Sequence, residues 1–219
     1  MNKSKIRLLY ICFIAGLFVS GQVGAQVPYD RIVNATEEPE NWLTYNGDYM
    51  SQRYSRLDQI TPDNVTNLEL KWILQNQVFG AWQSNPIIVD GVMYVTERPN
   101  SVMAVDASTG RVFWKFRHTP SENARVCCGA NNRGVAVLDD RVFMGTLDAR
   151  LIALDRINGQ PLWNTEVADV NLAYSVTMAP LVVKDKIIVG VGGGEYGIRG
   201  YVAAFDAETG EQAWKTYTI

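Results

Sequence analysis

Two cysteines stand side by side in the stretch "ARVCCGANNRG", residues 124–134, and Arg133 follows five residues after the second. Adjacent Cα atoms lie about 3.8 Å apart across a trans peptide, below the usual disulfide range of about 4.4–6.8 Å. A bond between Cys127 and Cys128 would therefore close a small strained ring that encloses almost no chain. The spacing leaves two interpretations open: two reduced thiols acting as small hydrophobes, or such a strained disulfide.

A second candidate is the glycine-rich stretch "GVGGGEYGIRG", residues 190–200. Its "GGGEYG" formally matches a dinucleotide fingerprint, but the strand "YVAAF" follows where that fingerprint requires a helix, so we reject it. Glycines let a backbone approach a bound group closely, and a carboxylate such as Glu195 among carbonyls suits a hard cation like Ca²⁺. The alternative is that Glu195 is a solvated side chain in a flexible turn.

A zinc or copper site, hydrolase or NTPase chemistry, and nucleic-acid binding have no support in the sequence. His118 is the only histidine, so it cannot build a zinc or copper site, and no Gly-x-Ser-x-Gly, His-Glu-x-x-His or P-loop motif occurs. The formal net charge is -3 with no basic tract, which argues against nucleic-acid binding.

An internal repeat identifies the elements that must position these residues. "AVDASTGRVFW", "ALDRINGQPLW" and "AFDAETGEQAW" each place an Asp eight residues and a Gly four residues before a Trp. Each repeat reads as four short strands. The predicted strands are 86–89, 92–95, 101–106 and 111–116; 134–138, 141–145, 150–155 and 160–165; and 180–183, 186–191, 201–206 and 211–216.

Four-stranded units of about 45–50 residues are typical of β-propeller blades. A β-sandwich is the alternative fold, but it would not reproduce the Asp, Gly and Trp frame. We expect the repeated Trp to pack blade on blade, and "NLELKW" around Trp72 to form an opening strand. Three blades and one strand do not close a ring, so we expect an all-β chain that is the N-terminal portion of a larger propeller.

The unusual loop residues should meet on one face of that propeller. Gln83, Arg133 and Thr177 each come shortly before the first strand of a blade, and the glycine-rich stretch follows the second strand of the third blade. Neighbouring strands in a blade are antiparallel, so the start of the first and the end of the second lie at the same end. Loops gathered on one face of a rigid scaffold are where function is usually found.

These residues resemble a known family. "CCGANNRGVAV", "GVGGGEYGIRGYVAAFDAETGE" and "NWLTYNGDYMSQRYSRLDQIT" are similar to the quinoprotein alcohol dehydrogenases of the methanol and ethanol dehydrogenase type, from about Asn41 to Trp214. The resemblance implies an eight-bladed propeller that carries pyrroloquinoline quinone (PQQ) and Ca²⁺, or a lanthanide in some branches. It further implies periplasmic oxidation of primary alcohols by hydride transfer to PQQ, with a cytochrome c as electron acceptor.

The resemblance also assigns roles to residues. Cys127 and Cys128 would form a vicinal disulfide lying flat against the quinone, Arg133 would contact the quinone oxygens, and Thr177 would hydrogen-bond the cofactor. The backbone that cradles a PQQ carboxylate would be that of Gly192, Gly193 and Gly194. The metal ligand would be Glu195. One position departs from the pattern: Gln83 stands where many members have a Glu near the cofactor.

In the family, the catalytic base, a second metal ligand and a stacking Trp come later in the chain than Ile219. We therefore expect no catalytic residue within this chain, and residues 26–219 alone should neither turn over nor hold PQQ tightly. Two alternatives are a non-catalytic exported propeller, such as an outer-membrane assembly factor, and a sugar-oxidising PQQ propeller. The first has no need of the cysteine pair and Glu195, and the second normally lacks adjacent cysteines.

The first 25 residues predict export. Three basic residues precede an apolar run of about 12 residues, Leu8 to Val19, and small residues follow at Val23 and Ala25. The run is too short to span a bilayer of about 30 Å as a helix, so we expect a signal peptide cut after Ala25 and no stable membrane insertion. Cleavage removes three positive charges and moves the net charge from -3 to -6.

Overall fold

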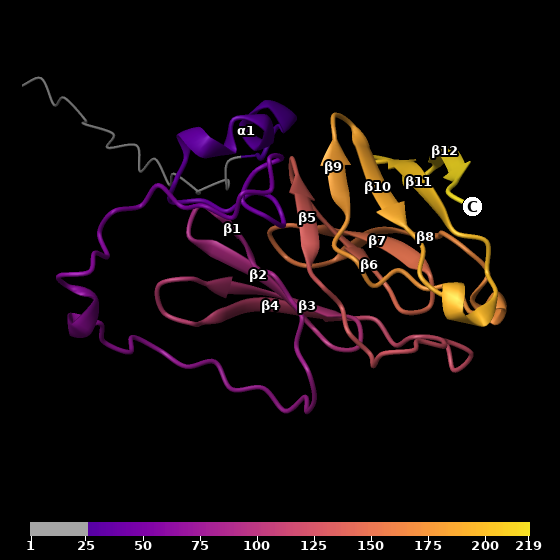
Figure 1. Cartoon of the computed structure of the whole chain (residues 1–219), viewed down its shortest axis with the longest axis horizontal. Helices are drawn as coiled ribbons and strands as arrows, with labels where there is room; N and C mark the ends of the chain where they lie inside the picture. The colour runs from indigo at the N-terminus through magenta and orange to yellow at the C-terminus, as the bar shows by residue number, and fades with distance from the viewer. Residues whose placement is uncertain (1–25) are drawn as a thin grey trace, which may run out of the picture.

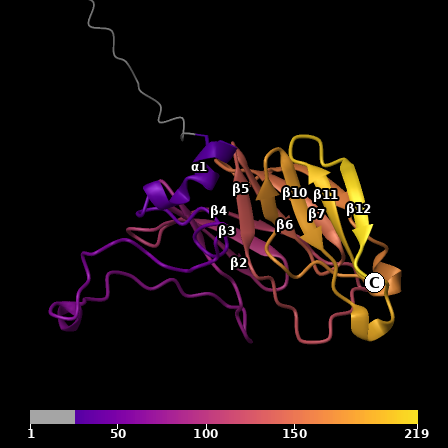
Figure 2. The same ribbon diagram turned by 45° about the horizontal axis from the view of Figure 1, so that its top comes forward.

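The computed structural model describes residues 26–219, so the predicted signal peptide of residues 1–25 lies outside the described residues. Three four-stranded antiparallel sheets follow one another along the chain and lie side by side (Figures 1 and 2). Blade one contains β1 (Ile87–Val89), β2 (Val92–Glu97), β3 (Ser101–Asp106) and β4 (Val112–Arg117). Blade two contains β5 (Val135–Leu138), β6 (Arg141–Gly145), β7 (Arg150–Asp155) and β8 (Pro161–Glu166). Blade three contains β9 (Leu181–Val183), β10 (Lys186–Gly190), β11 (Tyr201–Asp206) and β12 (Gln212–Tyr217).

The twelve predicted strands are confirmed to within a few residues at their ends. Each strand pairs with its neighbour in sequence, which is the order that tight hairpins impose. Asp90 and Gly91 form the first hairpin turn with φ of 51° and 77°, the left-handed backbone that a two-residue turn between twisted strands requires.

The Asp of each repeat closes the turn between the third and fourth strands of its blade. Asp106 Oδ1 accepts hydrogen bonds from the backbone N–H of Ser108 at 2.9 Å and of Thr109 at 3.3 Å, and the Gly110 N–H donates to the Asp106 carbonyl at 2.8 Å. Asp155 and Asp206 make the corresponding bonds. These turns lie at the end of each sheet opposite the cysteine loop, so the three aspartates are structural.

The repeated Trp docks each blade onto the next, as predicted. The indole Nε1 of Trp114 in blade one donates to the carbonyl of Arg156 in blade two at 3.0 Å, and that of Trp163 in blade two donates to Ala207 in blade three at 3.2 Å. The face of each indole covers the turn glycine of the next blade. A Cβ at Gly159 would stand 2.5 Å from the Trp114 ring, so only glycine admits this contact.

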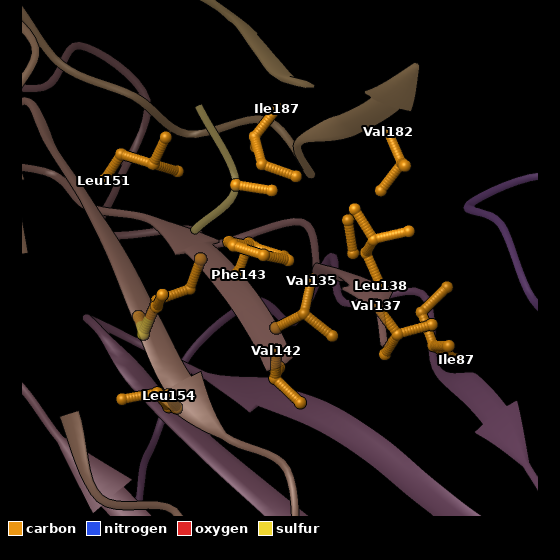
Figure 3. Packing of buried hydrophobic residues seen from close by; sticks show 14 of the residues in the cluster. Ile87, Val135, Val137, Leu138, Val142, Phe143, Leu151, Leu154, Val182 and Ile187 are labelled. Carbon is orange, nitrogen blue, oxygen red and sulfur yellow. The ribbon is translucent and has the colours of Figure 1, made fainter. Parts of the chain in front are cut away.

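Small and large residues alternate across each blade to make room for the indole. In blade two, Phe143 and Trp163 lie on either side of Ala153, and their ring centroids are 5.8 Å apart. Buried aliphatic residues from all three sheets join this row in a single cluster. Figure 3 shows Ile87, Val135, Phe143, Val182 and Ile187 meeting from five different strands.

The residues before blade one form a segment that contacts the first strand of blades one and three and the first hairpin turn of blade two. It contains α1 (Tyr29–Val33) and the 3-10 turn Ala35–Glu37, and a second 3-10 turn, Val65–Asn67, follows further along the chain. Its contacts with the blades include the bridges Val27–Asp139 and Trp42–Ile88 and the hydrogen bond from the Tyr49 hydroxyl to the Val182 carbonyl at 2.5 Å. Arg31 ties α1 to the first hairpin through Asp90 and also pairs with Glu38.

The opening strand expected around Trp72 is not formed. Within residues 26–219 no strand lies beside this stretch to pair with it, so it remains irregular. Trp72 nevertheless docks as the other repeat tryptophans do, because its Nε1 donates to the Ala107 carbonyl at 3.1 Å and its ring covers Gly110. No helix among the described residues is long and apolar enough to cross a membrane.

The blade contact can be tested with two glycine substitutions at similar backbone angles. A Cβ at Gly159 (φ 72°) would meet the Trp114 ring, whereas a Cβ at Gly91 (φ 77°) would have no atom within 4 Å. Each substitution to Ala should cost about 1–2 kcal/mol for the left-handed backbone. Gly159→Ala should cost about 1–3 kcal/mol more because it forces two blades apart. Denaturant unfolding of both variants measures the difference, and equal losses would contradict the docking role.

Candidate functional site

The loops predicted to converge line one cavity of about 160 Å³ at the end of the sheets where β5 and β9 begin and β10 ends. The lining residues are Val126, Cys127, Cys128, Gly129, Asn131, Arg133, Ser175, Thr177, Gly192, Gly193 and Glu195. Segments up to about 70 residues apart in the chain therefore meet at a single mouth. Gly194 and Gln83 are exposed and do not line it.

The adjacent cysteines are joined to each other. Cys127 and Cys128 form a disulfide between Cα atoms 3.8 Å apart, which decides between the two interpretations that the sequence left open. Both residues are exposed and sit in the long loop between β4 and β5. The two bonded sulfurs thus form part of the cavity wall, and the ring fixes their position relative to the backbone.

Arg133 is held in place from both neighbouring blades. Its guanidinium Nη1 donates to the Thr177 hydroxyl at 2.8 Å, and its backbone N–H donates to the Thr177 carbonyl at 3.1 Å. On the other side, the Asn85 N–H donates to the Arg133 carbonyl at 3.0 Å. A guanidinium carries five N–H donors, so the contact with Thr177 orients the group and leaves donors for a bound anion or carbonyl.

The glycine-rich stretch packs tightly against the segment that leads into blade three. Gly192 and Ser175 exchange two backbone hydrogen bonds of 2.8 and 3.1 Å, and a Cβ at Gly192 would lie 3.0 Å from the Ser175 hydroxyl. Gly193 has a φ of 121°, and a Cβ there would collide with the Ala173 carbonyl. The glycines are therefore needed for contact within the chain as well as for an open cavity wall.

Glu195 lies in the short 3-10 turn Gly194–Tyr196 that follows this contact. Its side chain is exposed at the cavity, which leaves its carboxylate oxygens available. Among residues 26–219 there is no cluster of three or more His, Cys, Asp or Glu that could hold a metal ion by itself. Glu195 is thus a single candidate ligand for a hard cation.

Two polar lining residues were not predicted from the sequence. Ser175 lies two residues before Thr177 in an extended segment, and that spacing places both side chains on the same side, so it could have been identified. Asn131 lies in the irregular cysteine loop, where no periodicity indicates the direction of a side chain. Both residues are buried, at 4% and 5% exposure.

A larger cavity of about 310 Å³ lies on the other side of Arg133, between the N-terminal segment and β5 and β9. Its wall is mostly aliphatic and aromatic, with contributions from Ile32, Leu43 and Met178. Apart from Arg133, none of its lining residues belongs to the predicted site. All of the site residues predicted from the sequence except Gly194 and Gln83 therefore line the smaller cavity.

The base of the cysteine loop is anchored to blade two through Asp148. This carboxylate, 7% exposed, lies 2.9 Å from His118 Nε2 and accepts the Ser121 N–H at 3.1 Å. Burial raises the pKa of Asp148, but hydrogen bonds from His118, Thr146 and Ser121 outweigh burial and lower that pKa to about 2. Asp148 therefore remains ionised and holds the start of the loop at neutral pH.

The anchor predicts a particular acid sensitivity. The folded pKa of about 2 lies below the value of about 3.9 in an unfolded chain, so the carboxylate stabilises the fold above about pH 4 and this contribution is lost as pH falls through 2. Asp148→Asn should remove about 1 kcal/mol of the stability that the wild-type protein loses between pH 6 and pH 3. Unfolding by denaturant at pH 3 and pH 6 measures the effect, with Asp63→Asn at an exposed position as the control. Identical pH slopes for the two variants would contradict the anchor.

Comparison with known proteins identifies the family to which this chain belongs. The β-propeller domain model of glucose, ethanol and alcohol dehydrogenases, a PQQ family, matches residues 42–218. The chain is 43% identical over 207 residues to the quinohemoprotein alcohol dehydrogenase ADH-IIG of Pseudomonas putida, covering 92% of this chain and 28% of that protein. It is 38% identical over 210 residues to the lanthanide-dependent methanol dehydrogenase of Methylacidiphilum fumariolicum (strain SolV), covering 94% of this chain and 34% of that protein.

Solved structures agree. The ADHIIG quinohemoprotein alcohol dehydrogenase from Pseudomonas putida HK5 superposes with a TM-score of 0.84 at 43% identity, over 87% of this chain and 28% of that one. A europium-containing methanol dehydrogenase gives 0.81 at 39% identity, over 86% and 34%. The chain thus spans about a third or less of the length of these relatives. Because the family model covers most of its residues and the three blades superpose, this chain belongs to the PQQ family of glucose, ethanol and alcohol dehydrogenase β-propeller domains.

Proposed function

We propose that the complete protein is a PQQ-dependent dehydrogenase that oxidises primary alcohols of the methanol or ethanol type with Ca²⁺ or a lanthanide in its site. The observation that carries this proposal is the single cavity shared by the Cys127–Cys128 disulfide, Arg133, Thr177 and Glu195. In this assignment residues 1–25 are a signal peptide and residues 26–219 are the N-terminal portion of the propeller. The catalytic base would come from another part of the complete protein.

The residues at the cavity fit the chemistry of PQQ. This cofactor is a planar tricyclic quinone with three carboxylates, so it needs a flat wall, cationic or N–H donors, and a cation near its carbonyl oxygens. The exposed disulfide offers the wall, and the guanidinium of Arg133 and the hydroxyls of Thr177 and Ser175 offer donors. The exposed carboxylate of Glu195 suits a hard cation.

When bound, PQQ supplies a two-electron acceptor and the cation supplies Lewis acidity toward it. The protein's own residues bind and orient. Arg133, fixed by Thr177 and by the chain at Asn85, would present its remaining donors at a constant position. Such preorganised charge is effective because no reorganisation is needed during the reaction. Glu195 would hold the cation, and the disulfide would exclude water from one face of the quinone.

Alcohol is the favoured substrate class because the relatives reported above are named alcohol dehydrogenase and methanol dehydrogenase. The cysteine pair argues against both a sugar-oxidising propeller and a non-catalytic scaffold, since a scaffold has no use for a vicinal disulfide beside an oriented arginine. The signal-like residues 1–25 support a periplasmic location. A cytochrome c acceptor is consistent with relatives described as quinohemoproteins, and neither nucleic acid nor membrane is a proposed partner.

The metal assignment is tested with two glutamates. The full-length protein, reconstituted with PQQ and Ca²⁺, is assayed for ethanol oxidation with an artificial electron acceptor. Glu195→Gln should raise the Ca²⁺ concentration for half-maximal activity by at least about tenfold because a charged ligand is lost. Glu208→Gln, in the turn at the opposite end of blade three, should leave it unchanged. If the two variants depend on Ca²⁺ concentration equally, Glu195 is not the metal ligand. If the wild-type protein does not oxidise ethanol, the proposed function is wrong.

The disulfide assignment is tested separately. In the double variant Cys127→Ser and Cys128→Ser, the two-sulfur wall is lost while the fold keeps its blade contacts. We expect PQQ binding, followed by the absorbance of the bound quinone, to weaken by roughly tenfold or more, since a stacking surface is worth about 1–3 kcal/mol. Thermal unfolding of the PQQ-free protein should change little, because the ring encloses almost no chain. A large loss of stability with unchanged PQQ affinity would reverse this interpretation.

A further inference from the structure

Two neighbouring asparagines in the cysteine loop are buried to the same degree but are used differently. Asn132, 4% exposed, has both ends of its amide paired: Nδ2 donates to the Gly145 carbonyl at 2.8 Å, and Oδ1 accepts the Gly134 N–H at 3.1 Å. Asn131, 5% exposed, uses only one end. Its Nδ2 donates to the Cys128 carbonyl at 3.0 Å, while its buried Oδ1 has no hydrogen-bond partner among the described residues.

The orientation of the Asn131 amide follows from its one partner. The Cys128 carbonyl can only accept, so the NH₂ end of the amide must face it. The other end is therefore an oxygen. A buried acceptor without a donor destabilises the protein relative to a paired one, so such an atom in a native site calls for a donor that the chain itself does not provide.

The unpaired oxygen belongs to a residue of the cavity wall. Asn131 lines the cavity together with the disulfide, Arg133, Thr177 and Glu195. The Arg133 Nη1 donates to Thr177, and the Asn131 backbone N–H bonds to the Gly129 carbonyl at 2.8 Å. Asn131 Nδ2 also donates to the backbone carbonyl of Cys128, so this side chain links the cavity wall to the backbone of the disulfide.

Building on the proposed function, we propose that Asn131 is a ligand-binding residue whose Oδ1 accepts a hydrogen bond from an N–H or O–H group of the molecule bound against the disulfide. Ionised carboxylates and quinone carbonyls are acceptors and would be repelled there. Asn131 therefore selects which edge of the ligand faces the cysteine loop. Two groups have the required chemistry: the pyrrole N–H of PQQ and the hydroxyl of the alcohol.

The experiment uses the full-length protein and three variants. Asn131→Leu removes the acceptor at similar volume, and Asn132→Leu removes a fully paired structural amide. The matched control is Asn123→Leu, an exposed asparagine of the same loop that bonds to Asn171 and lies outside the cavity. For each protein we would measure the Kd for PQQ by absorbance titration, the KM for ethanol after PQQ loading, and the thermal midpoint without PQQ.

If the PQQ N–H is the donor, Asn131→Leu should raise the Kd for PQQ by roughly tenfold while Asn123→Leu leaves it unchanged. PQQ methylated at the pyrrole nitrogen provides a double-mutant cycle. Methylation should weaken binding to the wild-type protein by a larger factor than binding to Asn131→Leu, because the bond is already lost in the variant. If the alcohol hydroxyl is the donor, the Kd for PQQ should stay constant and the KM for ethanol should rise by a similar factor.

The thermal midpoint separates binding from structure. Asn132→Leu should lower it clearly, whereas Asn131→Leu should lower it less, because it removes an unpaired acceptor together with one bond. If the wild-type protein binds PQQ and the Asn131→Leu variant has the same Kd for PQQ and KM for ethanol, this inference is wrong. The proposed function is not affected by that result. A wild-type protein that does not bind PQQ overturns both.

Discussion

The contact on which the structure depends is the indole of one blade lying over the turn glycine of the next. Trp72, Trp114 and Trp163 each donate Nε1 to a backbone carbonyl and cover a glycine of the following turn. The ring buries apolar area, the hydrogen bond fixes its direction, and the missing Cβ permits the close approach. Because the same three features recur, each blade docks on its neighbour through the same kind of contact, and loops at one end of the sheets are brought to one cavity.

That repetition separates the two ends of the sheets by function. At one end lie the turns closed by Asp106, Asp155 and Asp206, whose carboxylates are occupied by backbone N–H groups. At the other end lie the cysteine loop and the glycine-rich stretch, where polar groups have unused capacity: the donors of Arg133, the carboxylate of Glu195 and the oxygen of Asn131. The polar groups of the predicted site that remain available for binding therefore lie at one end of the scaffold.

Most of the fold could be predicted because its signals are local. Hairpin turns such as Asp90-Gly91 and the Asp, Gly and Trp frame specify strands, pairing order and blade contacts without reference to distant residues. The convergence of Cys127, Arg133, Thr177 and Glu195 then follows from strand direction alone. The family resemblance added the vicinal disulfide, which the residue spacing by itself had left undecided.

Other parts could not be predicted because their causes are not local. The stretch around Trp72 has the composition of a strand but has no described neighbour to pair with, and strand formation depends on that neighbour. Nothing in the sequence distinguishes Asn131 from Asn132. Only the positions of Gly145, Gly134 and Cys128 show that the Asn132 amide is hydrogen-bonded at both ends and the Asn131 amide at one. Gly194 and Gln83 were predicted to lie at the site from the family resemblance, Gln83 in place of the usual Glu, yet side chains and backbone in exposed turns need not face the cavity.

The N-terminal segment has a consequence for the order of folding. Val27 pairs with Asp139 and the Tyr49 hydroxyl bonds to Val182, 133 residues later in the chain. These are the contacts of highest sequence separation described above, and closing such long loops is slow compared with forming a hairpin. Blades one and two can assemble from neighbouring strands as the chain lengthens, but this segment has its full docking surface only after blade three exists. The segment that precedes the blades therefore completes its native contacts only after blade three has formed.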